Sequence, residues 1–209
     1  MNTSSLLHSF GRSVRSSLRP VAALLRVLLL LACAAQLQAA PPRVGETAPD
    51  FTLKTLSGDS VKLSGMTSAD HTVLVVLRGW PGYQCPFCTY QVFEYLGHAA
   101  DFSARNTRVI FIYPGPSEAL QAHAEEFLKD KPLPDGVVFL IDPNYEFTNR
   151  YGLRWNAKNE TAYPSTFVLD RNLSIKFAHV SREHGDRISA AAVLRFLGES
   201  MPKEMSGQR

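Results

Sequence analysis

The chain is poor in cysteine and in metal-ligand clusters, and each shortage excludes a class of protein. It holds three cysteines among 209 residues. Three cysteines cannot build the disulfide network that stabilises small secreted scaffolds. A zinc site needs about four ligands, and the histidines after residue 39 are scattered without ligand-like spacing. We therefore expect neither a disulfide scaffold nor a metal, and no other cofactor.

The first 39 residues have the pattern of an export signal. Residues 1–39 contain four arginines and no acid, and residues 27–35 are almost wholly apolar. That run is too short to span a bilayer comfortably, and the small residues Ala39 and Ala40 follow it. We predict a signal peptide and an exported, periplasmic protein. An uncleaved membrane anchor, or lipid attachment at Cys33, is the alternative.

The net positive charge of the chain belongs to this signal. The whole sequence has 22 lysines and arginines against 19 acids, a formal charge of +3. Without residues 1–39 it has 18 against 19, a formal charge of −1. Nucleic-acid binding relies on clustered lysines and arginines. We therefore predict no nucleic-acid partner, and contact with a membrane only through an anchor.

The two remaining cysteines lie where a buried strand gives way to a helix. Residues 71–77 are apolar without alternation, which predicts a strand covered on both faces, and Pro86 suits the first turn of a helix. Cys85 and Cys88 then stand at the helix start, where N–H groups and the helix dipole favour a thiolate. Their disulfide ring would be small and would stabilise the fold little. A redox cycle explains the pair better than a structural disulfide.

Hydrophobic patterning predicts one α/β domain over residues 40–201, followed by a disordered tail at residues 202–209. We expect a hairpin at residues 50–64 and strands at residues 71–77, 108–113, 137–141, 166–170 and 174–180. We expect helices at residues 85–104, 118–129, 145–151 and 189–197. Strands that alternate with helices imply a parallel core, and the closing strand pair adds an antiparallel edge. The prediction is a mixed central sheet flanked by helices, with an N-terminal β-hairpin extension.

Two stretches resemble a known family. Cys85-Pro86-Phe87-Cys88 and the later Tyr163-Pro164-Ser165-Thr166-Phe167-Val168-Leu169-Asp170 are similar to the thioredoxin-like superfamily. Within it they resemble the redoxin branch, the peroxiredoxin-like alkyl hydroperoxide reductase and thiol-specific antioxidant proteins. The resemblance covers roughly residues 44–197 and implies a thioredoxin-like fold. It also implies that Pro164 is the cis-proline that faces the dithiol, exposing the backbone of Tyr163 to a substrate strand.

The resemblance supports two registers, which assign different roles to the cysteines. In the thioredoxin register, Cys85 attacks and Cys88 resolves. In the peroxiredoxin register, Pro81-x-x-x-Cys85-x-x-Cys88 is similar to Pro-x-x-x-Thr/Ser-x-x-Cys, and Cys88 attacks. Peroxiredoxins also place an arginine before their last central strand, where this chain has Pro164. Arg78 either supplies the missing positive charge or is a solvated arginine at a strand end.

The function implied by the resemblance is that of a thiol oxidoreductase with antioxidant activity. The cysteine pair would reduce a peroxide or a protein disulfide, and an external dithiol donor would re-reduce it. The alternatives are a thiol-disulfide reductase without peroxidase activity, and a non-catalytic binding module with a structural disulfide. The predicted site residues are Cys85, Cys88, Pro164, Pro81 and Arg78.

Overall fold

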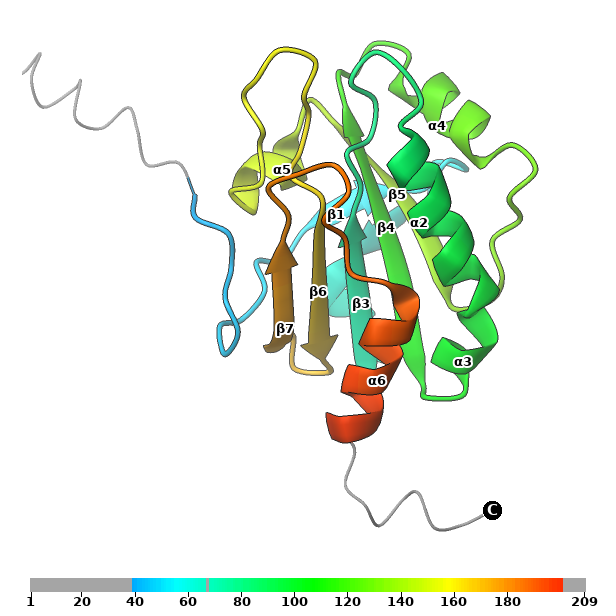
Figure 1. Cartoon of the computed structure of the whole chain (residues 1–209), viewed down its shortest axis with the longest axis vertical. Helices are drawn as coiled ribbons and strands as arrows, with labels where there is room; N and C mark the ends of the chain where they lie inside the picture. The colour runs from blue at the N-terminus through cyan, green and yellow to red at the C-terminus, as the bar shows by residue number, and fades with distance from the viewer. Residues whose placement is uncertain (1–38, 67, 201–209) are drawn as a thin grey trace, which may run out of the picture. The chain divides into compact units, whose positions relative to one another are not determined.

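The computed structural model describes residues 39–66 and 68–200 (Figure 1). The signal peptide predicted for residues 1–39, apart from Ala39, lies outside the described residues. So do Cys33 and the tail predicted at residues 202–209. In the described part of the chain, no helix combines the length and the apolar character needed to cross a membrane.

A mixed sheet of seven strands forms the centre of the described domain, in the order β2-β1-β5-β4-β3-β6-β7. The strands are β1 Thr52–Lys54, β2 Ser60–Lys62, β3 His71–Val76, β4 Thr107–Gly115, β5 Val137–Pro143, β6 Ser165–Asp170 and β7 Ile175–Val180. Strands β3, β4 and β5 are parallel, whereas β6 runs antiparallel to β3, and β7 antiparallel to β6. The predicted parallel core with an antiparallel edge is therefore confirmed.

The predicted N-terminal hairpin is also present and lengthens the sheet. Strands β1 and β2 pair antiparallel around the turn at Gly58. Lys54 of β1 then pairs with Ile141 of β5, again antiparallel. The hairpin therefore covers the free edge of β5, and the α/β, thioredoxin-like architecture expected from the sequence is complete.

Helices cover both faces of this sheet. They are α2 Pro86–Gly97, α3 Ala99–Ser103, α4 Leu120–Leu128, α5 Glu146–Arg150 and α6 Ala190–Ser200, with a 3₁₀ turn η2 at Leu63–Gly65. Figure 1 shows α2 and α6 in front of the sheet. The helix predicted at residues 85–104 is broken at His98, whose ψ of 12° is not helical. Gly97 precedes the break, and glycine is a poor helix former.

The packing of β3 explains how the sheet positions the loop that follows it. Val73 and Val75 face the apolar cluster that includes α2 and α6, whereas Leu74 and Val76 face the cluster that includes α5. All four side chains are fully buried, as expected for a central strand. Each contributes about 1.5–3 kcal/mol of burial free energy. The loop after β3 is therefore attached to one of the best-packed elements of the domain.

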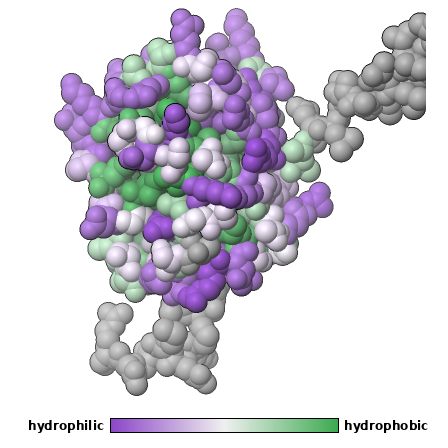
Figure 2. Space-filling model, turned by 180° about the vertical axis from the view of Figure 1, so that it is seen from behind, coloured by the Kyte–Doolittle hydropathy of each residue, from purple (hydrophilic) through white to green (hydrophobic). Residues whose placement is uncertain are grey.

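Figure 2 shows the molecule from behind, with hydrophilic side chains along the margin of that face and apolar residues between them. The apolar cluster beneath the α5 side of the sheet is anchored by Phe51, Phe147 and Tyr151. Their rings contact one another with centroid distances of 4.1–6.2 Å. Both carboxylate oxygens of buried Asp142 accept hydrogen bonds from the first turn of α5. The α5 side of the sheet therefore has a buried apolar cluster of its own, separate from the cluster under α2 and α6.

Candidate functional site

The loop between β3 and α2 carries both cysteines, and its path depends on one glycine. Gly79 has a φ of +70°, and a Cβ at this position would lie 1.9 Å from the carbonyl oxygen of Pro114. Any other residue would clash with the backbone of β4. The next residue, Trp80, donates its N–H to the same oxygen at 2.9 Å. The loop is thus held against the end of β4 before it enters α2.

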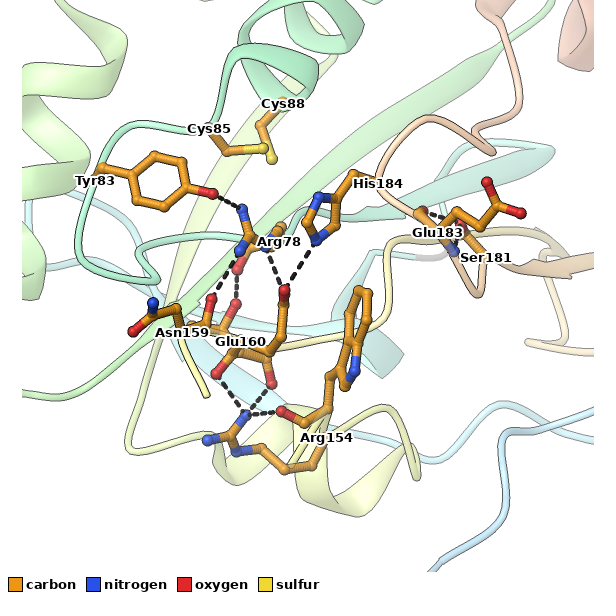
Figure 3. A network of polar contacts seen from close by, with 12 residues as sticks. Arg78, Tyr83, Cys85, Cys88, Arg154, Asn159, Glu160, Ser181, Glu183 and His184 are labelled. Atoms are coloured by element: carbon orange, nitrogen blue, oxygen red, sulfur yellow. Dashed lines mark hydrogen bonds and ion pairs between the residues drawn. The ribbon is translucent and has the colours of Figure 1, made fainter. Parts of the chain in front are cut away.

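The cysteines occupy the first turn of α2. Cys85 directly precedes the helix, and Pro86 is its first residue. The Cys85 and Cys88 residues are only 1% and 0% exposed, and both are free thiols. Figure 3 shows their sulfur atoms directed toward each other. The predicted placement of the pair at a helix start is what the structure shows.

The two thiols have opposite acidities. The pKa of Cys85 is lowered to about 5, because the thiol of Cys88 donates a hydrogen bond to its thiolate. Burial opposes this effect, whereas the backbone N–H of Cys88, the charge of Arg187 and a hydrogen bond from Arg78 lower the pKa further. The pKa of Cys88 is raised, because burial disfavours its charged form and the neighbouring Cys85 needs its proton. These opposite shifts favour the thiolate at Cys85 and the thiol at Cys88.

Arg187 belongs to this site although the sequence does not reveal it. It lies in the loop between β7 and α6, with Nη2 at 3.5 Å from Cys88 Sγ and 4.0 Å from Cys85 Sγ. Nη1 donates to Gln91 Oε1 at 2.7 Å, and Nε donates to the carbonyl of His184 at 2.7 Å. The separation of 99 residues from Cys88 leaves no local signal in the sequence.

Arg78 is buried, so the alternative of a solvated arginine at the strand end is wrong. It is 2% exposed, and its Nε donates to Glu160 Oε2 at 2.6 Å. It also donates to the hydroxyl of Tyr83 and, at 2.7 Å, to the carbonyl of Asn159. Burial alone would lower the pKa of Arg78, but the hydrogen bonds to Glu160 and Tyr83 outweigh it and raise that pKa. Arg78 therefore stays charged in the interior.

Glu160 connects two parts of the site. Its side chain is 11% exposed, and its second oxygen, Oε1, lies 2.9 Å from Nε2 of His184 (Figure 3). The segment that carries it is held by Arg154, which donates to the carbonyl of Trp155 at 2.7 Å and to that of Glu160 at 3.1 Å. The sequence predicts only a polar, irregular segment here, whereas in the structure it forms one wall of the site.

Pro164 does not have the predicted conformation. No cis peptide bond occurs among the described residues, so the cis bond expected between Tyr163 and Pro164 is a wrong prediction. The N–H of Tyr163 donates to Leu153 at 2.9 Å, and its carbonyl accepts from the Ser165 hydroxyl at 2.9 Å. Because both backbone groups are paired within the domain, Tyr163 offers no free edge to a substrate strand.

The predicted site residues come together only in part. Cys85, Cys88 and Arg78 surround one position at the end of β3. Pro81 is half-buried in the connecting loop, and Pro164 is buried beside the end of β3, because Ser165 pairs with Val76. In residues 39–66 and 68–200, no cluster of three or more histidine, cysteine or acidic side chains that could hold a metal is found.

Comparison with known proteins agrees with this architecture. The Redoxin family model matches residues 43–194, which is most of the chain. The chain belongs to the Redoxin family. It is a thioredoxin-like, thiol-dependent oxidoreductase, as the resemblance of its two cysteine and proline motifs implied.

Relatives of this redoxin include the alkyl hydroperoxide reductase E of Mycobacterium tuberculosis and of Mycobacterium bovis. Each is 28% identical over 143 residues, which are 66% of this chain and 86% of the relative. Among solved structures, the peroxidoxin BcpB of M. tuberculosis superposes with a TM-score of 0.61 and 20% identity, covering 77% of this chain and 99% of that one. The mitochondrial 2-Cys peroxiredoxin of Plasmodium falciparum gives a TM-score of 0.60 and 19% identity, with 80% and 99% covered. The two structures establish the fold.

Proposed function

We propose that this redoxin reduces peroxides, with Cys85 as the attacking thiolate and Cys88 as the resolving thiol. The observation that carries the proposal is the placement of the two thiols: Cys85 directly precedes α2, whereas Cys88 lies within the helix and is fully buried. This placement lowers the pKa of Cys85 and raises that of Cys88. A thiolate is the nucleophile in this chemistry, and the thiol that keeps its proton is suited to resolve. The assignment follows the thioredoxin register of roles, although the substrate is that of a peroxidase.

The proposed cycle balances with a dithiol donor as the only reductant. The Cys85 thiolate attacks the terminal oxygen of the peroxide, the O–O bond breaks, and the alkoxide leaves and takes up a proton. Cys85 becomes a sulfenic acid. Cys88 attacks that sulfur, the S–S bond forms, and the hydroxyl group leaves with the Cys88 proton as water. The external dithiol then returns two electrons and two protons.

Burial of the pair supports a small substrate. Cys85 is 1% exposed. To attack a protein disulfide, its sulfur would have to come into contact with a sulfur atom of another protein. The backbone of Tyr163 is paired internally and gives no strand for a protein to pair with. A peroxide needs little space. The 28% identity to alkyl hydroperoxide reductase E adds support.

Stopped-flow oxidation of the reduced protein by hydrogen peroxide and by an organic hydroperoxide tests the proposal. The C88S variant should accumulate sulfenic acid on Cys85, which dimedone traps and peptide mass spectrometry locates. The C85S variant should react no faster than a free thiol, because Cys88 is buried and holds its proton. Dimedone on Cys88, or a wild-type rate no faster than that of free cysteine, would contradict the proposal.

A thiol-disulfide reductase is the second candidate, and exposed aromatic residues next to the pair favour it. Phe87 is 49% and Tyr90 74% exposed. Both line a groove of about 500 Å³ that also contains Arg187 and Ile188. Large aromatic residues at a surface are typical of protein docking. Reduction of insulin by the reduced protein, faster than its reaction with peroxide, would favour this candidate.

We further propose that the protein is exported. The support is the arginine-rich, then apolar, then alanine-containing pattern of residues 1–39. An oxidising compartment would also require a dedicated dithiol donor to keep the pair reduced. Mass spectrometry of the protein from fractionated cells of its source organism tests this. A new N-terminus near Ala39 or Ala40 supports export, and an intact N-terminus in the cytoplasmic fraction argues against it.

A further inference from the structure

His184 contacts both arginine networks around the cysteine pair. We propose that His184 is a positioning residue that adjusts the positive charge available to Cys85, because it competes with Arg78 for Glu160. This inference rests on the proposed role of Cys85 as the attacking thiolate. It adds a residue on the loop between β7 and α6 that acts through a carboxylate.

The first contact is made by the imidazole ring. Glu160 presents Oε2 to Arg78 at 2.6 Å and Oε1 to His184 Nε2 at 2.9 Å. An ionised carboxylate can only accept hydrogen bonds, so Nε2 carries the proton that faces it. Figure 3 shows the carboxylate placed between the guanidinium and the ring. One largely buried negative charge is therefore shared by two groups from different elements.

The second contact is made by the backbone of the same residue. The carbonyl of His184 accepts a hydrogen bond from Arg187 Nε at 2.7 Å, and Arg187 reaches the cysteine sulfurs with Nη2. The ring anchors the loop to Glu160, and the carbonyl orients the arginine that the loop delivers. Because the ring and the carbonyl belong to the same residue, a change in the ring contact also affects the carbonyl that orients Arg187.

The protonation state of His184 changes the charge of this assembly. When the ring is neutral, the charges of Glu160 and Arg78 cancel. When the ring is protonated, the three groups carry a net charge of +1. The carboxylate of Glu160 then offsets less of the charge of Arg78. A positive charge close to a thiolate stabilises it and makes it less nucleophilic. Protonated His184 should therefore give a more stable and slower thiolate at Cys85.

Among residues 39–66 and 68–200, no acid other than Glu160 lies within 4.0 Å of the His184 ring nitrogens. The neighbouring rings of Phe87 and Trp155, at centroid distances of 6.5 and 5.3 Å, are uncharged. On its own loop, Glu183 and Asp186 are exposed, and Asp186 lies 3.1 Å from His179. The ring contacts Glu160, and Arg78 and Tyr83 lie beyond that carboxylate. The carbonyl of His184 contacts Arg187, which reaches Cys85 and Cys88.

The experiment measures alkylation of the reduced full-length protein by iodoacetamide from pH 4 to pH 9. Absorbance at 240 nm gives the thiolate fraction at each pH, and the rate divided by this fraction gives the reactivity of the thiolate. In the wild type this reactivity should rise about threefold as the pH increases, because the ring loses its proton and the positive charge beside Cys85 falls. In H184Q, which can hydrogen-bond Glu160 but cannot be protonated there, it should stay constant.

A matched control is available on the surface. His98 pairs with Asp101 at 2.8 Å, as His184 pairs with Glu160, but it lies at the junction of α2 and α3. H98Q should therefore keep the wild-type pH profile. In the E160Q background, H184Q should change nothing further if the histidine acts through the carboxylate. Circular dichroism of each variant identifies any that fails to fold.

Two results would overturn the inference. One is a wild-type profile in which the reactivity of the thiolate shows no step with pH; the other is the same step in H184Q. Peptide mapping of the alkylated cysteine keeps the inference separate from the proposed function. Alkylation of Cys88 in place of Cys85 would reject the proposed assignment of roles, whereas a step lost in H184Q with Cys85 alkylated supports both.

Discussion

Two arginines approach the cysteine pair, and they differ in what else they bind. Arg78 is held by a carboxylate, with Glu160 at 2.6 Å, and by two further oxygens. Arg187 donates to an amide oxygen, to a carbonyl and to sulfur, and in the described part of the chain no carboxylate lies within 4.0 Å of it. The charge of Arg78 is largely offset by Glu160, so its hydrogen bond to Cys85 lowers the pKa of that thiol less than the charge of Arg187 does.

This difference in partners gives the two arginines different roles in the protein. A buried guanidinium with a carboxylate partner joins the end of β3 to the segment that precedes β6, and the Thr161 hydroxyl donates to the carbonyl of Arg78 to complete that joint. A guanidinium bound only to neutral groups keeps its field for the sulfur atoms and for an alkoxide that forms beside them. We therefore expect Arg78 to govern stability and Arg187 to govern reactivity.

The largest expected effect is the loss of stability in R78A. Removing Arg78 leaves the carboxylate of Glu160, at 11% exposure, with the ring of His184 but without its guanidinium partner, and breaking a buried pair in this way costs about 3–5 kcal/mol. Urea unfolding of the reduced protein measures the free energy. The control is R171A, which removes a partner of Asp70 at 63% and 40% side-chain exposure and should cost less than about 1 kcal/mol. Equal losses in both variants would contradict the difference in burial.

The second effect concerns the hydrogen bond that the Cys88 thiol donates to Cys85. In C88A the Cys85 thiolate loses the hydrogen bond from Cys88, which is the largest cause of its lowered pKa. A hydrogen bond to a charged group contributes about 1.5–3 kcal/mol, so the titration midpoint at 240 nm should rise by roughly one to two pH units. C88S retains a hydroxyl donor and should show a smaller rise. An unchanged midpoint in C88A would mean that the arginines alone hold the thiolate.

The third effect is specific to Arg187. R187A should raise the pKa of Cys85 from about 5 by roughly one pH unit and leave the unfolding free energy close to that of the wild type. Oxidation by peroxide should slow by roughly tenfold or more, because the leaving alkoxide loses a positive partner. Alkylation by iodoacetamide should not slow, since the thiolate becomes more nucleophilic as its pKa rises. Equal slowing of both reactions would indicate a structural role.

The smallest effect should come from making Arg187 resemble Arg78. Gln91 Oε1 accepts from Arg187 at 2.7 Å, so Q91E places a carboxylate where the neutral amide stands. The offset charge should raise the titration midpoint of Cys85 in the same direction as R187A, by about half a pH unit. Q121E, on the exposed surface of α4, is the control. A lowered midpoint in Q91E would show that Arg187 acts through position and not through charge.

Much of the fold could be predicted because it depends on patterns local in sequence. The apolar run at residues 71–77 predicts a buried strand, and β3 is that strand. Pro86 predicts a helix start, and it is the first residue of α2. The break at His98 was missed because the hydrophobic pattern of α2 continues through it into α3. Strand and helix periodicities are properties of neighbouring residues, so they can be recognised without tertiary contacts.

The cysteine pair, its position at a helix start and its redoxin-like context were therefore determined by the sequence itself. Tertiary structure alone decided which charges surround the pair. Glu160 reaches Arg78 and Arg187 reaches the sulfur atoms, each from a separate loop. The backbone pairing of Tyr163 closes the strand edge that Pro164 was expected to open. The acidity of a thiol depends on distance in space and on burial, and neither quantity can be obtained from the spacing of residues along the chain.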